Sequence, residues 1–290
     1  MDRKWDLWRV LMTCLGGFWL LDGILQLQPA MFTSAFVNTV LAPNLQSQPH
    51  IIETLVAFGI RVFSINIFWF NLASALIQLL IGVLLLFPFR RATGRFDTQR
   101  FGLWLSIIWA FIVWIFGEGF GLLFTGSATF YTGGPGSALL YLILALFLLY
   151  SSSDSGGKRL PLAAGIIFIL GGLLNLAPMF WQPTMLSMLA MTPGVSATLS
   201  TFGAQGTMIG NLIAIDVLVF IGIFLILAPN RPIAWIAIIF LAVIWAIGQN
   251  FGGLQTFPFG TATDPNSAPL LALFLLPIFF TMPPAQTSPQ

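Results

Sequence analysis

Hydrophobic residues occur in long, nearly uninterrupted runs along this chain, and short segments containing most of the charged residues separate the runs. A helix needs about 20 apolar residues to cross the roughly 30 Å hydrocarbon core of a bilayer. Runs of this length predict membrane-spanning helices. The predicted spans are residues 9–28, 65–88, 101–123, 137–150, 160–178, 207–228, 232–253 and 268–282.

Two segments outside these spans have a different pattern. Residues 51–63 are apolar, but Glu53 and Arg61 interrupt them. This composition predicts a helix that lies at the membrane interface or folds back into the bundle, within a longer outer segment, 29–63. The tail, residues 283–290, is polar and rich in proline, so we expect it to be disordered.

The basic residues give the predicted bundle an orientation. Of the 11 Lys and Arg residues, all except Arg61 fall on one side of the predicted spans. By the positive-inside rule this side is cytoplasmic, and both termini are therefore expected in the cytoplasm. The residues on this side are Arg3, Lys4, Arg9, Arg90, Arg91, Arg95, Arg100, Lys158, Arg159 and Arg231.

The composition supports a membrane protein and narrows its chemistry. Of the 290 residues, 58% are hydrophobic and 7% are charged, whereas soluble domains carry about 25% charged residues. The single cysteine, Cys14, excludes an intramolecular disulfide, and the single histidine, His50, excludes a multi-histidine metal site. The net charge of +2 gives no indication of nucleic-acid binding. We expect no metal site and no cofactor bound by this chain alone.

The two halves of the chain resemble each other, and the matching segments keep their order. This self-similarity predicts a duplicated structural unit. The matches are Leu25–Pro29 with Leu174–Pro178, Asn71-Leu72 with Asn211-Leu212, Trp114–Gly121 with Trp245–Gly252, and Gly126–Thr129 with Gly260–Thr263.

An even number of spans in each half gives both halves the same orientation in the membrane. The sequence therefore predicts an all-α, polytopic membrane protein with two parallel four-helix repeats, related by a pseudo-two-fold axis along the membrane normal. The first repeat is expected over residues 1–150 and the second over 160–282, joined by a cytoplasmic linker, 151–159.

Polar side chains within the first repeat form the main candidate site. Charged groups near the bilayer centre cost about 2.5–3.5 kcal/mol on insertion scales, so each requires an explanation. We expect the Arg61 guanidinium to pair with the carboxylates of Asp22 and Glu118. Such a cluster either fixes the bundle or forms an outward-opening site for a substrate or a proton. Gln26 and Trp114 complete the candidate set.

The second repeat keeps polar residues at corresponding positions but loses their charge. Gly171 stands opposite Asp22, and Gln249-Asn250 stand opposite Glu118-Gly119. This difference predicts one working site, in the first repeat. The second-repeat candidates are Asp216, Asn175, Gln249 and Asn250.

Asp216 lies near the middle of a predicted span, without a basic residue nearby in sequence. We expect it to be either a protonated structural residue, bonded by neighbouring amides, or a proton relay. Asp264 belongs to the polar segment Thr263–Ser267, for which we expect a turn and a helix cap.

Part of the first repeat resembles the DoxX-like membrane proteins. Their first helix carries an arginine, then a glycine and an aromatic residue, then a glycine followed three residues later by a lysine. The matching residues are Arg9, Gly16-Gly17-Phe18, Gly23 and Gln26, and Gln78–Leu86 with Arg90 resembles the second helix. Gln26 replaces the lysine and Gln78 replaces an acidic residue, while the second repeat lacks the arginine and the aromatic residue.

The resemblance implies that the chain is a tandem duplication of that family's four-helix unit. The family includes the DoxD-type membrane subunit of thiosulfate:quinone oxidoreductase. The resemblance therefore implies a membrane subunit that handles a quinone or small sulfur compounds, with electron carriers on partner subunits. A quinone headgroup requires one or two hydrogen-bond partners in an apolar pocket, which Asp22, Gln26, Glu118 and Trp114 can provide.

These observations favour an accessory or quinone-interacting subunit of a redox system in a bacterial inner membrane. One alternative is a proton-coupled transporter or channel for a small solute, and another is a structural subunit of a larger assembly. A closed outer pocket favours the redox role, whereas a continuous path lined by Asp22, Glu118 and Asp216 favours transport. The sequence assigns no catalytic residue and predicts neither the substrate nor the oligomeric state.

Overall fold

Long apolar helices dominate the computed structural model, which describes residues 3–88, 97–150 and 156–281. Every regular secondary-structure element in these ranges is helical, which confirms the predicted all-α class. Five helices are long and apolar enough to cross a membrane, so the chain is a multi-pass membrane protein. They are Leu7–Leu25, Ile67–Leu86, Thr98–Gly117, Ala204–Leu227 and Arg231–Gly248; shorter apolar helices occupy Ser137–Tyr150 and Ser267–Phe280.

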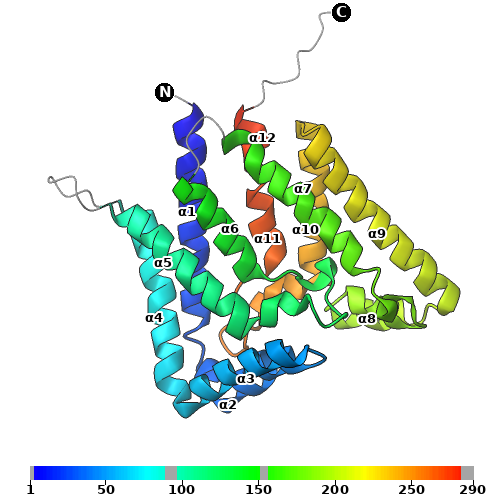
Figure 1. Cartoon of the computed structure of the whole chain (residues 1–290), viewed down its shortest axis with the longest axis horizontal. Coiled ribbons are helices and arrows are strands. Elements are labelled where there is room, and N and C mark those ends of the chain that lie inside the picture. Colours follow the sequence, from blue (N-terminus) through cyan, green and yellow to red (C-terminus); the bar gives the residue numbers. More distant parts are fainter. Residues whose placement is uncertain (1–2, 89–96, 151–155, 282–290) are drawn as a thin grey trace, which may run out of the picture.

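The long helices of the second half occur in an order similar to those of the first half. The first half contains α1 (Arg3–Leu25), α4 (Ile67–Leu86), α5 (Thr98–Ile112) and α6 (Ser137–Tyr150). The second half contains α7 (Gly156–Leu174), α9 (Ala204–Leu227), α10 (Arg231–Val243), α11 (Ser267–Leu273) and α12 (Leu276–Thr281). The start of α1 and the end of α12 lie at the same end of the bundle (Figure 1).

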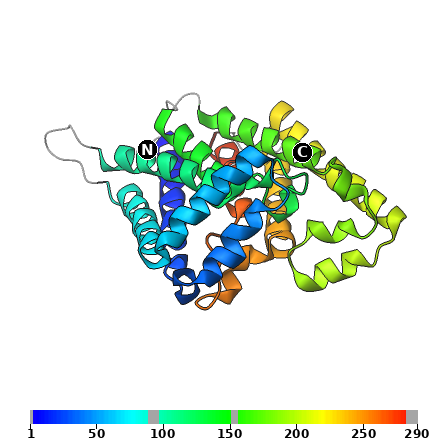
Figure 2. The same ribbon diagram turned by 60° about the horizontal axis from the view of Figure 1, so that its bottom comes forward.

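Short helices cover the opposite end of the bundle. In the first half these are α2 (Ser34–Phe36) and α3 (His50–Ile65), and in the second half α8 (Pro193–Ser200). The helix α3 runs across the bundle rather than along it (Figure 2). Most of the predicted linker, 151–159, and the predicted tail, 283–290, fall outside the described residues.

Glycine pairs allow close packing of the first two long helices in each half. A Cβ atom at Gly82 would lie 2.9 Å from the carbonyl oxygen of Gly16, so α1 and α4 touch through their backbones. A Cβ atom at Gly222 would lie 2.7 Å from the carbonyl oxygen of Gly165, which gives α7 and α9 the same contact. Small residues at such crossings are typical of membrane helix pairs.

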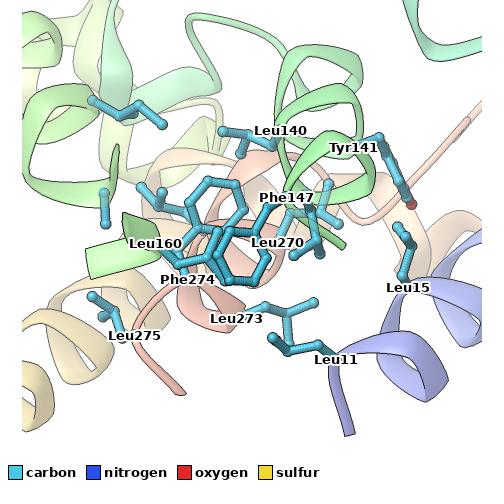
Figure 3. Packing of buried hydrophobic residues seen from close by; sticks show 14 of the residues in the cluster. Leu11, Leu15, Leu140, Tyr141, Phe147, Leu160, Leu270, Leu273, Phe274 and Leu275 are labelled. Carbon is cyan, nitrogen blue, oxygen red and sulfur yellow. The ribbon is translucent and has the colours of Figure 1, made fainter. Parts of the chain in front are cut away.

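The hydrophobic core joins the two halves. Leu11 and Leu15 of α1 and Leu140 of α6 pack in the same cluster as Leu270 and Phe274 from the second half (Figure 3). Because α6 and α11 lie at the centre of this cluster, the halves share one core instead of folding as separate bodies.

A sharp corner follows α5 in the first half, and a similar corner follows α10 in the second half. A π-helical turn, Val113–Gly117, follows α5, and a second one, Ile244–Gly248, follows α10. The next residues include Gly121 and Gly252, with φ of +62° and +64°, a left-handed conformation that glycine adopts without a steric penalty. The predicted spans 101–123 and 232–253 therefore extend too far, because these corners end the helices at about residues 117 and 248.

The last predicted span, 268–282, is also interrupted. It divides into α11 and α12 at Phe274-Leu275. Pro277 lies at the start of α12, where a residue without a backbone N–H is tolerated. In the interior of one continuous helix the same proline would break the helix.

Candidate functional site

A cavity of about 680 Å³ lies between the first half and the loop of the second half that follows α10. The last turns of α1, the start of α6 and the corner after α5 line it from the first half, and residues 249–266 line it from the second. The start of α1 and the end of α12 lie at one end of the bundle, so the last turns of α1 place the cavity toward the opposite end (Figure 1).

Three carboxyl groups face this cavity from different elements. Asp22 of α1 is 2% exposed, and Glu118 follows the π-helical turn after α5. Asp264 comes from the second half and acts electrostatically on both of them. Among the described residues that line the cavity, none is Lys, Arg or His. The cavity therefore has an acidic lining without a basic counter-charge.

The Glu118 carboxylate caps the start of α6. It accepts hydrogen bonds from the Ser137 hydroxyl at 2.7 Å and from the backbone N–H of Ala138 at 3.1 Å. A carboxylate at a helix N-terminus interacts favourably with the helix dipole. Glu118 lies just beyond the span Thr98–Gly117. Burial, together with the nearby Asp264 carboxylate, raises the pKa of Glu118 to about 8, although the bonds to Ser137 and Ala138 oppose this rise.

Four polar atoms on the cavity lining are buried and have no hydrogen-bond partner. They belong to four different helices: Asp22 Oδ1 in α1, Gln78 Oε1 in α4, Trp109 Nε1 in α5 and the Tyr141 hydroxyl in α6. Leaving a buried polar group unsatisfied costs about 1–3 kcal/mol. The Asp22 carboxyl and the Tyr141 hydroxyl are close enough to interact, but the hydroxyl has no hydrogen bond of standard geometry. These atoms can therefore bind a ligand or water within the cavity.

Gln26 lines the same cavity, but its amide already has a partner. Gln26 Nε2 donates to Asn71 Oδ1, and Asn71 Nδ2 donates back to the Gln26 carbonyl oxygen at 2.9 Å. In the second half, Asn211 Nδ2 donates to the Asn175 carbonyl oxygen, also at 2.9 Å. Gln26 and Asn71 thus join α1 to α4, and Asn175 and Asn211 make the corresponding connection between α7 and α9.

The expected Arg61 cluster does not form. Arg61 is exposed on α3 and does not line the cavity, while Asp22 is buried within it. Among the described groups, the charge that acts on the Glu118 carboxyl is that of Asp264, not of Arg61. The prediction was wrong because α3 lies across the end of the bundle and leaves the Arg61 side chain on the outside.

Trp114 does not line the cavity, and its contacts stabilise the corner after α5. Its Nε1 donates to the Pro135 carbonyl oxygen at 3.0 Å, and its ring packs edge-on against Phe120. These contacts hold the corner after α5 against the loop that leads to α6. Trp109, one turn earlier, lines the cavity in its place.

The second-half candidates separate into two groups. Gln249 and Asn250 line the same cavity as Asp22, so they do not form a site of their own. Asn175 is buried in the contact with Asn211, and Asp216 is exposed on α9. The expected bonding of Asp216 by Asn211 is absent because the two side chains lie on different faces of α9.

Asp264 has both the predicted local role and a role at the cavity. Its carboxylate accepts the backbone N–H of Asn266 at 2.7 Å, and Asn266 caps α11, so the turn and the cap are present. The position of this turn opposite Asp22 and Glu118 was not predicted. Its place directly after the matched segment Gly260–Thr263 is the only signal in the sequence, and that signal does not give the path of the loop.

The described residues contain no group of three or more His, Cys, Asp and Glu side chains that could hold a metal ion.

Comparison with models of known protein families, with curated proteins and with solved structures finds no match for this chain.

Proposed function

We propose that this protein binds the headgroup of a quinone in the acidic cavity and acts as an accessory subunit of a membrane redox system. Its setting in this proposal is a bacterial inner membrane, with both termini in the cytoplasm and two parallel four-helix repeats. The observation that carries the proposal is the set of four unpartnered polar atoms on one cavity lining, from Asp22, Gln78, Trp109 and Tyr141.

The chemistry of these four atoms supports a ligand that both accepts and donates hydrogen bonds. Trp109 Nε1 and the Tyr141 hydroxyl can donate to the two carbonyl oxygens of a quinone. Gln78 Oε1 and the Asp22 carboxylate can accept the hydroxyl groups of the reduced quinol. The carboxyl groups of Asp22 and Glu118 can exchange the protons that accompany reduction, while the electrons are assigned to a partner subunit.

The size and the apolar part of the lining also suit such a ligand. Small-molecule pockets range from about 300 to 1,000 Å³ and are mainly apolar with a few polar groups. The cavity volume of about 680 Å³ falls in this range, and Phe36, Phe63 and Phe116 contribute aromatic surface. A quinone ring can pack against these side chains.

The position of Asp216 favours this function over proton-coupled transport. A transport path was expected to be lined by Asp22, Glu118 and Asp216 together, but Asp216 does not line the cavity. A purely structural subunit is expected to have partners for its buried polar groups, and the four atoms described above have none.

A binding measurement with two matched tyrosine variants tests the proposal. The full chain in lipid nanodiscs is titrated with decylubiquinone and with a short-chain naphthoquinone, and quenching of tryptophan fluorescence gives the Kd. Tyr141→Phe removes one donor and should weaken binding about tenfold. Tyr150→Phe is the control, because Tyr150 is exposed on the same helix and outside the cavity lining.

A second substitution makes the test independent of one side chain. Trp109→Phe should also weaken binding, whereas Trp104→Phe, on the exposed face of α5, should not. Thermal midpoints of all four variants establish that each one folds. The proposal fails if neither quinone binds to the wild-type chain. It also fails if the Tyr141→Phe and Tyr150→Phe variants bind the quinones equally well.

A further inference from the structure

Asp216 places a carboxyl group on the outer surface of a membrane-spanning helix. It lies in α9, with 12 residues of the helix before it and 11 after it. At 1.5 Å per residue, it is about 17 Å from either end, too far for its short side chain to reach water beyond the lipid. A charged group at this depth costs about 2.5–3.5 kcal/mol on insertion scales and is expected to face a polar partner.

The chain itself provides no such partner in its described part. The residues three and four positions away along the helix, Leu212, Ile213, Val219 and Phe220, are all apolar. The Asp216 side chain is exposed, and no described hydrogen bond involves its carboxylate. The helix α9 lies at the edge of the molecule in both views (Figure 1 and Figure 2), so its outer face is open to another helix.

The exposed residues around Asp216 form a continuous stripe with the spacing of a helix–helix seam. They follow each other in alternate steps of four and three residues, the repeat that two helices share when their side chains interlock. The stripe consists of Ile209, Ile213, Asp216, Phe220, Ile223 and Leu227, all of them exposed. A single polar residue within an apolar seam specifies the partner and the register of the pair.

We propose that this stripe, the α9 seam, docks a membrane-spanning helix of a different protein that carries one Lys or Arg at mid-membrane depth. Opposite charge is the chemistry that compensates a carboxylate in lipid. A second copy of this chain does not offer it, because the basic residues of the described spans, Arg9, Arg100 and Arg231, lie within the first three residues of each span. Of the other described cations, Lys158 and Arg159 lie at the start of α7, away from mid-membrane depth, and Arg61 belongs to α3 at the opposite end of the bundle.

Synthetic membrane helices of defined sequence test this proposal. The full chain carries a fluorescent donor and is reconstituted in vesicles of zwitterionic phospholipid. Two acceptor-labelled helices of leucine and alanine are compared, one with a central lysine and one with a central leucine. Energy transfer should show about tenfold tighter association of the lysine helix.

Substitutions at two equivalent positions provide the control. Asp216→Asn should abolish the preference for the lysine helix, and Asp216→Lys should create a preference for a helix with a central aspartate. Leu76→Asn changes an exposed residue at the corresponding position of α4 and should leave the preference unchanged. Unchanged tryptophan spectra and thermal midpoints show that the variants fold.

Two results would overturn the proposal. One is equal association of the wild-type chain with the lysine and leucine helices. The other is a homodimer of the wild-type chain, detected by energy transfer between donor- and acceptor-labelled copies, that Asp216→Asn abolishes. The second result would assign the α9 seam to a second copy of this chain. Neither readout depends on quinone binding.

Discussion

The corners that follow α5 and α10 are built from the same contacts but differ in charge. Glu118 accepts hydrogen bonds from Ser137 and Ala138, whereas Gln249 donates to the Ser267 hydroxyl and accepts the Ala268 N–H. Since a neutral glutamine makes the same connections, the charge of Glu118 is not required to hold the corner together. Its carboxyl group is instead a specific feature of the cavity in the first half.

A second difference lies at the positions of Asp22 and Gly171. Asp22 and Gly171 are counterparts, and Phe130 of the first half packs directly on Gly171. Asp264 directly follows the second-half segment that matches the one before Phe130, and it faces Asp22. Each half therefore sends a loop toward the other: one loop fills the space with an aromatic ring, and the other leaves it open and acidic.

The largest loss of stability is expected when an aspartate is introduced at Gly171, the counterpart of Asp22, where Phe130 fills the space. A Cβ atom at Gly171 would lie 2.7 Å from the Phe130 ring, so Gly171→Asp forces a clash and also buries an unpaired carboxyl. We expect a loss of about 4 kcal/mol or more in the free energy of unfolding. Unfolding with SDS in mixed micelles measures it.

The reciprocal change, Asp22→Gly, is the control for this experiment. It removes a carboxyl group from an open cavity and costs mainly helix propensity, about 1 kcal/mol. If the two substitutions destabilise the protein equally, the two sides are not different in the way that we describe.

A smaller effect is expected when the two corner glycines are compared. A Cβ atom at Gly121 would overlap the Pro135 carbonyl group, and one at Gly252 would lie 2.7 Å from the carbonyl carbon of Pro265. Both residues have positive φ, which disfavours alanine. We expect Gly121→Ala to cost about 3 kcal/mol and Gly252→Ala about 1–2 kcal/mol.

The same SDS titration measures both glycine variants, with Gly194→Ala as the control because a Cβ atom there meets no neighbour. If Gly121→Ala changes the free energy of unfolding by less than expected, the corner tolerates a wider turn than the structure has.

A change of stability with pH is expected from the charge difference at the corners. The Glu118 pKa is about 8 in the folded protein and about 4.5 when unfolded. Between these values the folded state retains a proton that the unfolded state releases, so stability should fall as pH rises from 4.5 to 8. The thermal midpoint, measured at a series of pH values, should therefore decrease across this range.

Exchanging the two residues sharpens this comparison. Glu118→Gln should fold, as the Gln249 corner does, and should remove that part of the pH dependence. Gln249→Glu should add a similar dependence, and Glu53→Gln, exposed on α3, should leave the wild-type slope unchanged. A slope that persists in Glu118→Gln would assign the pH dependence to another group.

Local features of the fold were predictable and the site was only partly so. The hydrophobic runs predicted an all-helical membrane protein, and the structure confirms that coarse description. Asp22, Gln26 and Glu118 were identified as unusual and do line one cavity. Arg61 and Trp114 were assigned to the same site and lie outside it. Tyr141 and Trp109 were not predicted, and Gln78 was identified only by its match to the second helix of the DoxX-like proteins, because aromatic and amide residues are common in apolar helices.

The long apolar helices of this membrane protein could be predicted from the sequence alone, because transfer of an apolar run into lipid depends on composition within about 20 residues. The sequence also determined where charge is unusual. The sequence does not reveal which of these groups meet, because their contacts depend on the rotation of each helix about its axis and on the path of the loops. Packing between the halves sets both, and it brings Asp264 to Asp22 and leaves Asp216 facing outward.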